Sequence, residues 1–318
     1  MLRSIVDFIA RARYLEVESR GVKFLRTNLQ GSGVFPVSRV ESMGMNDFAD
    51  AEIGEFMGLF RIPALRKLAL CDPTLRHVAH QGLWSQLTHI RVSLAITLEQ
   101  WRTFIRDCAA VKSAWITLNI GQSTSAKHST HAIPNLHELA INVAGDVGDI
   151  FDSIHLPALK TLLLAAPSLT LDGLHGLLES TPLLERIRLS TIFPISDHEP
   201  WMDFPKKTGS LAHHAPYLYH LMLDVPNIPI SLRDYVDGMG RSGWLKGPWV
   251  NRPLLRVDFH WLCREEEIMS DLEQYVHLPR DGLEQVNITV RARAETVETN
   301  SSDTIPFWDL WYDLGAEF

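Results

Sequence analysis

Pairs of histidines at the spacing of metal ligands on a helix are the first residues in this chain that could do chemistry. They occur at residues 77–80 and 128–131, each with two residues between the imidazoles. A zinc site needs further ligands, and neither pair has a cysteine nearby or a carboxylate at a completing spacing. The adjacent His213 and His214 would point to opposite faces of a strand. We therefore interpret the histidines as scattered surface residues and predict no metal site.

A glycine-rich segment raises the question of a nucleotide cofactor. Residues 238–243 read Gly-x-Gly-x-x-Gly, the spacing of a dinucleotide-binding turn. That turn needs a buried strand before it and a helix after it. The charged stretch Arg-Asp-Tyr-Val-Asp at 233–237 is not a buried strand, and the Gly-Pro-containing stretch 244–248 is not a helix. We interpret the segment as a loop and predict no cofactor.

Catalytic signatures are missing from the chain. It contains no Gly-x-Ser-x-Gly elbow and no Walker loop. An enzyme would need carboxylates or histidines converging in a pocket, for example beside Asp224, Asp258 and His260, and the sequence offers no positive sign of one. We therefore predict that the protein is not an enzyme.

The composition describes a folded, mildly acidic protein. The chain has 318 residues, of which 46% are hydrophobic and 21% charged, and its formal net charge is -8. These proportions are typical of folded rather than disordered proteins. A net negative charge disfavours non-specific contact with nucleic acid. We predict no nucleic-acid partner.

Cysteine usage and the N-terminus bear on location. Cys71, Cys108 and Cys263 are few, odd in number and far apart, which predicts no disulfide framework and favours a reducing compartment. Residues 1–7 lack the apolar run and cleavage site of a secretory signal, and no stretch has the length that spans a bilayer. We expect a cytoplasmic or nuclear protein with no membrane association.

One hydrophobic pattern recurs along the chain, and the elements that it predicts must hold the candidate residues in place. The spacing Pro-x-Leu-x-x-Leu-x-Leu, or a close variant, occupies residues 63–70, 134–141, 157–164, 182–189 and 216–223. Early units recur every 22–25 residues or so, roughly the period of leucine-rich repeats. We take the first leucine-like residue of each unit as its anchor: Leu65, Leu87, Val111, Leu136, Leu159, Leu184, Leu218, Leu255 and Leu283.

Each unit predicts a strand, a turn and a helix. The proline two residues before the anchor cannot continue a helix and favours extended backbone before it, so it ends a helix and starts the strand segment. The alternating leucines that follow predict a strand with one buried face. Apolar residues have helical spacing at 97–108 and at 170–180, where Thr170 is the expected N-cap. We predict an α/β leucine-rich-repeat solenoid with parallel concave strands and convex helices.

The repeats resemble those of one known class. Residues 173–189 read Gly-Leu-x-x-Leu-Leu-x-x-Thr-Pro-x-Leu-x-x-Ile-x-Leu, which is similar to the repeats of F-box-type leucine-rich-repeat proteins, of the sort abundant in mushroom-forming fungi. The resemblance covers residues 60–190 well and the remainder loosely. It implies a substrate-recognition subunit of a ubiquitin ligase, presenting proteins for ubiquitination.

Two departures from that class weaken the functional inference. The asparagine that usually follows Leu-x-Leu is missing from most units. The F-box itself, an N-terminal helical module that docks a Skp1-type adaptor, typically opens with a Leu-Pro-x-Glu-like segment, and residues 1–50 contain nothing like it. Either the sequence is truncated, or the protein is a relative without an F-box, or the N-terminal residues are an unfamiliar cap.

The same pattern divides the chain into three parts. Residues 1–60 are expected to be degenerate N-terminal repeats or a cap, with candidate strands at 15–17 and 37–40. Residues 61–293 are the expected solenoid, with insertions near 191–215 and 225–252. Residues 294–318 are a polar linker followed by an aromatic and acidic segment, which is either a cap for the last repeat or a partner-binding peptide.

Residues that alternate with the buried ones on each strand point out of the concave face and could contact a partner. An apolar stripe flanked by arginines has the composition of a protein interface. Alternatively, the insertions bury this stripe, or the register is off by one residue, which would exchange the two faces. We predict partner-binding residues at Arg91, Trp115, Leu163, Arg186, Arg188, His220, Met222, Asp224, Asp258 and His260.

The function predicted from the sequence is a non-catalytic protein-binding scaffold. By resemblance it would be the substrate-recognition component of an F-box-like ubiquitin ligase. The alternative is a leucine-rich-repeat adaptor or regulatory protein with no link to ubiquitin. On this interpretation Trp115→Ala and Arg188→Glu are expected to reduce partner capture and leave the circular dichroism spectrum unchanged.

Overall fold

The chain forms two compact units, each described here by itself. Unit 1 comprises residues 1–123 and 133–138, and unit 2 comprises residues 124–132 and 139–318. The computed structural model describes residues 2–29, 35–36, 39–46, 60–70, 84–119, 131–144, 148–151, 154–169, 171–192, 211–225, 245, 255–263 and 286–294. The predicted tripartite division of the chain is not tested by this grouping and stays a prediction.

Unit 1 contains a parallel sheet with one strand per repeat. Its strands lie in the order β1 (Tyr14–Glu18), β3 (Ser42–Asn46), β5 (Lys67–Leu70), β6 (His89–Thr97) and β7 (Ser113–Asn119). Every adjacent pair is parallel. The short strands β2 (Phe35–Pro36) and β4 (Phe60–Arg61) pair separately. Sequential parallel strands, one per unit, are the arrangement that a repeat array produces.

Unit 2 continues the same plan with its own strands. Their order is β9 (Glu138–Ala144, in unit 2 apart from its first residue), β11 (Thr161–Ser168), β12 (Arg186–Ile192), β13 (His220–Val225), β14 (Leu255–Cys263) and β15 (Val286–Ala294). The pairs from β11 to β15 are parallel. A short pair, β8 (His131–Ala132) with β10 (Ile154–His155), lies outside this sheet. Both units are therefore α/β leucine-rich-repeat structures, as predicted.

In the repeats that contain it, the recurring proline sits in a tight turn before the strand. The amide of Leu65 donates to the Ile62 carbonyl (3.3 Å), and the Leu184 amide donates to the Thr181 carbonyl (3.1 Å). These are four-residue turns with proline at the second position, which its fixed φ favours. Cys108 is the first residue of the equivalent turn in its repeat, and it is fully buried. Burial raises the pKa of its thiol, which keeps it protonated and unreactive.

Within each unit, a ladder of main-chain hydrogen bonds joins one repeat to the next just after the anchor. In most of the described repeats, two consecutive amides donate to a single carbonyl of the preceding repeat. In unit 1 the accepting carbonyls are those of Arg13, Glu41, Arg66, Thr88 and Lys112, and in unit 2 they include those of Lys160 and Glu185. The ladder needs no side chains, so repeats of different sequence can keep one register.

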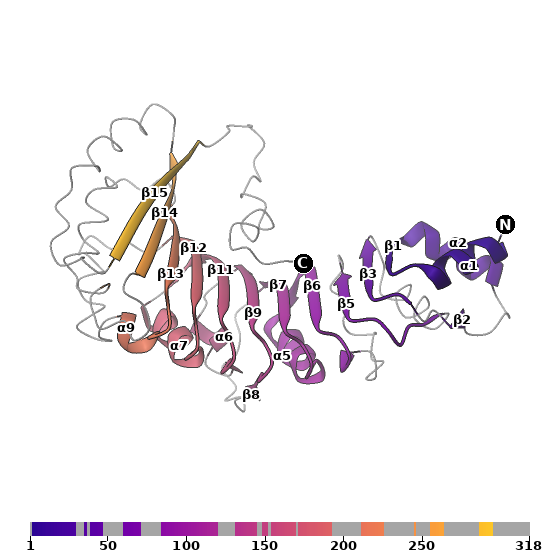
Figure 1. Cartoon of the computed structure of the whole chain (residues 1–318), viewed down its shortest axis with the longest axis horizontal. Coiled ribbons are helices and arrows are strands. Elements are labelled where there is room, and N and C mark those ends of the chain that lie inside the picture. The colour runs from indigo at the N-terminus through magenta and orange to yellow at the C-terminus, as the bar shows by residue number, and fades with distance from the viewer. Residues whose placement is uncertain are drawn as a thin grey trace. The chain divides into compact units, whose positions relative to one another are not determined.

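Helices cover one face of each sheet. In unit 1, α5 (Leu98–Asp107) packs against β6 and β7, and α1 (Leu2–Arg11) and α2 (Ser19–Leu29) flank β1. In unit 2, α6 (Gly148–Phe151) packs against α7 (Leu171–Ser180), which in turn contacts α9 (Leu211–His214). Figure 1 shows α7 and α9 on the same side of the neighbouring strands. The opposite face of the strands is therefore the candidate surface for binding.

The start of α5 is secured by two reciprocal hydrogen bonds. The Gln100 amide donates to Thr97 Oγ1 (3.2 Å), and the Thr97 amide donates to Gln100 Oε1 (2.8 Å). This is a capping box, which satisfies two amides that the helix cannot pair internally. The helix then buries Leu98 and Trp101 against the sheet, as the helical spacing of residues 97–108 predicts.

Removing the cap should destabilise unit 1 modestly. We expect Thr97→Ala to lower the free energy of unfolding by about 1 kcal/mol, because the amide of Gln100 loses its acceptor. Thr97→Ser keeps the hydroxyl and should lose much less. Urea unfolding followed by circular dichroism measures both variants. Equal losses in the two would mean that the hydroxyl does not contribute.

The core lies where the anchors and the alternating leucines predict it. Leu65, Leu136 and Leu184 are fully or almost fully buried, and so are the strand residues that follow them at the inward positions. The inward set in the later strands is Leu162, Leu164, Ile187, Leu189, Leu221, Leu223 and Val257, all at most 1% exposed. On β5 the inward Leu68 and Leu70 are buried and the outward Lys67 and Ala69 are half-buried, which agrees with the predicted register of the two faces.

Two sequence predictions need correction. The candidate strand at residues 37–40 is wrong, because the strand of that repeat is β3, and the fully buried Val40 takes the anchor position two residues before it. His213 and His214 lie on α9 rather than in a strand. The N-cap at Thr170, most of the two predicted insertions and residues 295–318 lie outside the described residues.

Candidate binding face

The outward face of the unit 1 strands carries two rows of side chains in exact register. Along one row Glu16 pairs with Gly44, Gly44 with Ala69, Ala69 with Arg91 and Arg91 with Trp115. The other row, two residues earlier on each strand, consists of Tyr14, Ser42, Lys67, His89 and Ser113. Parallel strands lie about 4.8 Å apart, so neighbours in a row can contact a common partner.

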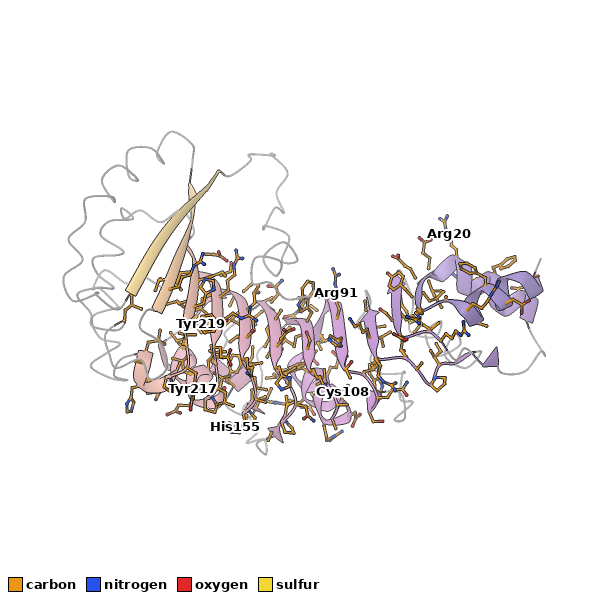
Figure 2. The ribbon with its side chains drawn as sticks, viewed as in Figure 1. Arg20, Arg91, Cys108, His155, Tyr217 and Tyr219 are labelled. Atoms are coloured by element: carbon orange, nitrogen blue, oxygen red, sulfur yellow. The ribbon has the colours of Figure 1, made fainter. Side chains whose placement is uncertain are left out.

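Part of this face reaches solvent. Lys67, Ala69, His89 and Arg91 are all partly exposed, whereas the residues between them on the same strands are buried. Figure 2 shows Arg91 projecting from the side of the strands opposite α5, while Cys108 lies on the α5 side. The alternation of β5 and β6 thus separates a closed core face from an accessible face.

Arg91 is held in place by the indole of Trp115. Its guanidinium carbon lies 4.9 Å from the centroid of the Trp115 ring. A cation at this distance over an aromatic face is attracted by the ring quadrupole. Trp115 itself is only 2% exposed. The indole therefore serves as a support for Arg91 rather than as an open contact surface.

Gly44 lies beside two polar side chains at the other end of the row. A Cβ at this position would lie 3.5 Å from Tyr14 Oη and 3.8 Å from Glu16 Cγ. Tyr14 Oη donates to Glu16 Oε2 at 3.4 Å. Burial raises the pKa of the Tyr14 phenol and the Glu16 carboxylate adds to the rise, whereas Arg91 opposes it. The Tyr14 phenol is therefore within the electrostatic reach of the Arg91 guanidinium.

His89 lies in a positively charged surrounding. Its Nδ1 is 2.8 Å from Thr88 Oγ1. Burial lowers the pKa of His89, and the charges of Lys67 and Lys112 lower it further. The imidazole is therefore neutral at pH 7, and its protonation costs more in the folded chain than in the unfolded one.

This shifted pKa makes stability depend on pH. Because the folded-state pKa of His89 lies below 6.5, the unfolded chain takes up the proton first. The free energy of unfolding should be unaffected by His89 above pH 6.5 and should fall as the pH is lowered from 6.5 towards the folded-state value. His89→Gln removes the titrating group, and urea unfolding at a series of pH values should then show a flatter profile than wild type. Identical profiles would contradict the prediction.

On the outward face of unit 2, the most prominent feature is a buried ion pair. Arg188 on β12 donates to both carboxylate oxygens of Asp224 on β13, through Nε and an Nη, at 2.9 Å each. The two side chains are 1% and 3% exposed. A two-point contact between a guanidinium and a carboxylate is among the stronger polar interactions in proteins. In this structure the pair is closed to an outside partner.

The other predicted contact residues in unit 2 differ in exposure. Leu163 and Met222 are buried, and Arg186 and His220 are half-buried. Arg186 Nε donates to Thr161 Oγ1 at 3.2 Å. Asp258 pairs in register with Met222, and His260 with Asp224; for these two residues of β14 the structure describes the backbone only. The structure therefore brings the predicted set onto one face of unit 2 and buries half of it.

These burials change one expectation from the sequence. Arg188→Glu would place a second carboxylate against Asp224 in a buried site, and Trp115→Ala would empty a buried volume. Both variants are expected to lose folding together with any binding. The assignment of the ten predicted residues to partner binding is not tested by burial and stays a prediction.

Sequence reasoning missed the N-terminal part of the site. Tyr14, Glu16 and Gly44 were not among the predicted contact residues. Gly44 was missed because β3 was expected five or six residues earlier in the chain. The usable signal was Val40, an apolar residue two positions before an alternating stretch. Lys67, Ala69 and His89 do follow from the predicted alternation.

Some of the described histidines contact one another but do not form a metal site. The imidazoles of His175 and His214 meet edge to face with centroids 4.8 Å apart, and those of His213 and His214 are 5.2 Å apart. Within the described part of the chain no group of three or more histidine, cysteine, aspartate or glutamate residues could hold a metal ion. None of the described helices is both long enough and apolar enough to cross a membrane.

Comparisons with known proteins add little to this geometry. No protein-family model matches the chain, and no curated protein matches it. Among solved structures, the crystal structure of the TLR13–ssRNA13 complex is similar at a TM-score of 0.34 and 12% sequence identity. The match covers 80% of this chain and 35% of that one. A likeness at this level carries no argument about partners, so the prediction that nucleic acid is not a partner is not confirmed.

Proposed function

We propose that this protein is a non-catalytic scaffold that binds another protein through the outward face of its strands. The observation that carries the proposal is the accessible face of unit 1, where Lys67, Ala69, His89 and Arg91 stand in register above a closed core. Rigid strands hold these groups at fixed spacing, which reduces the entropy lost on binding. An aromatic-supported arginine is also a common anchor of protein interfaces.

The finer proposal concerns ubiquitin. The resemblance of residues 173–189 to F-box-type repeats supports a role as the substrate-recognition component of a ubiquitin ligase, working in the cytoplasm or nucleus. That role requires a Skp1-type adaptor as a second partner. The alternative, an adaptor or regulatory protein unrelated to ubiquitin, requires only the partner on the strand face.

Affinity purification of the tagged chain from its native cells separates these proposals. Mass spectrometry identifies what stays bound after washing, and a variant with Arg91→Glu shows which proteins depend on the strand face. Loss of a protein from the Arg91→Glu sample supports the scaffold proposal, and a Skp1-type adaptor with a cullin supports the ligase. If every retained protein is equally abundant in both samples, binding through this face is wrong.

A further inference from the structure

Positive charge gathers on the accessible face of unit 1, although the chain as a whole carries a net charge of -8. Lys67 on β5 is the register partner of His89 on β6. Lys112 immediately precedes Ser113, the next partner in that row, and its amide donates to the Thr88 carbonyl (2.8 Å). Arg91 stands two residues along from His89 on the same strand. Burial lowers the pKa of His89, and the charges of Lys67 and Lys112 lower it further, which agrees with their placement around the imidazole.

We propose that this face, made by Lys67, His89, Arg91 and Lys112, binds an acidic segment of a partner protein. The inference rests on the proposed scaffold function and specifies the chemistry of its partner. Carboxylates spaced along an extended chain would meet cations on successive strands about 4.8 Å apart. Charge complementarity of this kind contributes chiefly to specificity and to the rate of association.

An acidic protein segment fits this face better than a nucleic acid does. Glu16 lies on the same face as Arg91, and Glu138 follows Lys112 in the main-chain ladder, so acids bound the cationic area on two sides. A phosphate backbone that continues past the cations in both directions would be repelled by these acids, whereas a short acidic segment can end before it reaches them. Trp115, the ring nearest Arg91, is buried beneath it and offers no open surface on which a base could stack, whereas the exposed ring of Tyr14 lies on β1 at the far end of the face.

The test is a fluorescence anisotropy titration of the full chain with a labelled peptide of alternating glutamate and alanine. A peptide with glutamine in place of glutamate and an oligouridine RNA are the comparison probes. We expect the acidic peptide to bind most tightly. Lys67→Glu and Lys112→Glu should each weaken its binding roughly fivefold, since each variant replaces an attraction by a repulsion. Circular dichroism establishes that both variants are folded.

Arg106→Glu is the matched control. It makes the same change in net charge, but Arg106 is exposed on α5, the helix on the other side of the strands. This variant should bind the acidic peptide as wild type does. Equal weakening in all three variants, equal binding of the glutamine peptide, or tighter binding of the RNA would each overturn the inference.

Failure of this inference is distinguishable from failure of the scaffold function. If the acidic peptide does not bind, yet proteins captured from native cells still depend on Arg91, the strand face binds a partner of different chemistry and only the inference falls. If, in addition, capture of every protein is unchanged by Arg91→Glu, both the inference and the proposed scaffold function are wrong.

Discussion

Asp224→Ala should lower the free energy of unfolding of the repeats around β12 and β13 by about 3–5 kcal/mol, because it leaves the guanidinium of Arg188 buried without its carboxylate. In the native chain both hydrogen bonds of the pair are 2.9 Å long, and both side chains are almost inaccessible to water. Repeat arrays can unfold locally. The measurement therefore combines urea unfolding with hydrogen exchange of the β12 and β13 amides.

Two comparisons make this prediction specific. Replacing both members with apolar residues, Arg188→Met with Asp224→Leu, should recover most of the loss, since no charge then stays buried. Lys160→Ala breaks an exposed pair with Glu185, whose atoms are 2.8 Å apart, and should cost less than about 1 kcal/mol. If Asp224→Ala costs no more than Lys160→Ala, the Arg188–Asp224 pair does not stabilise the fold.

Trp115→Ala, made by itself, is expected to lower the free energy of unfolding of unit 1 by about 3–5 kcal/mol. The indole is 2% exposed, so its removal leaves a cavity, and it also withdraws the ring that supports Arg91. Thermal unfolding followed by far-ultraviolet circular dichroism measures the loss. Trp115→Phe retains a ring beneath the guanidinium and should lose less.

A result in which Trp115→Ala unfolds like wild type would show that the indole is not part of the closed structure. Trp115 could then contact a partner directly, as its place in the alternation predicts. With the burial seen here, tests of partner binding are better made at Lys67 and Lys112, whose replacement leaves no cavity.

Much of the fold follows from local chemistry that a sequence displays. The anchor spacing predicts the turns, because proline has one permitted φ and the anchor amide closes the turn onto a carbonyl three residues back. The alternation of leucines predicts which face of each strand is buried, since side chains alternate with a period of two. Both predictions hold at Leu162 and Leu164 and at their counterparts Ile187 and Leu189.

The N-terminal repeats were harder to place, for a physical reason. Their register comes from main-chain bonds, such as that from the Ser42 amide to the Arg13 carbonyl, which have no sequence signature. Degenerate side chains, including Gly44 at an outward position, are tolerated because the ladder holds the strand. The strand was therefore expected at residues 37–40 and lies instead at Ser42–Asn46.

By itself the sequence determined the repeat class, the anchors, and the assignment of residues to the inward or outward face, because these depend on spacings within a few residues. Only the tertiary structure decided which outward residues are accessible. Arg188 and Asp224 are 36 residues apart, and they meet because consecutive repeats stack β12 against β13. The support of Arg91 by Trp115 likewise depends on the pairing of two strands. Burial is a property of what packs above a residue, and alternation along one strand carries no information about that.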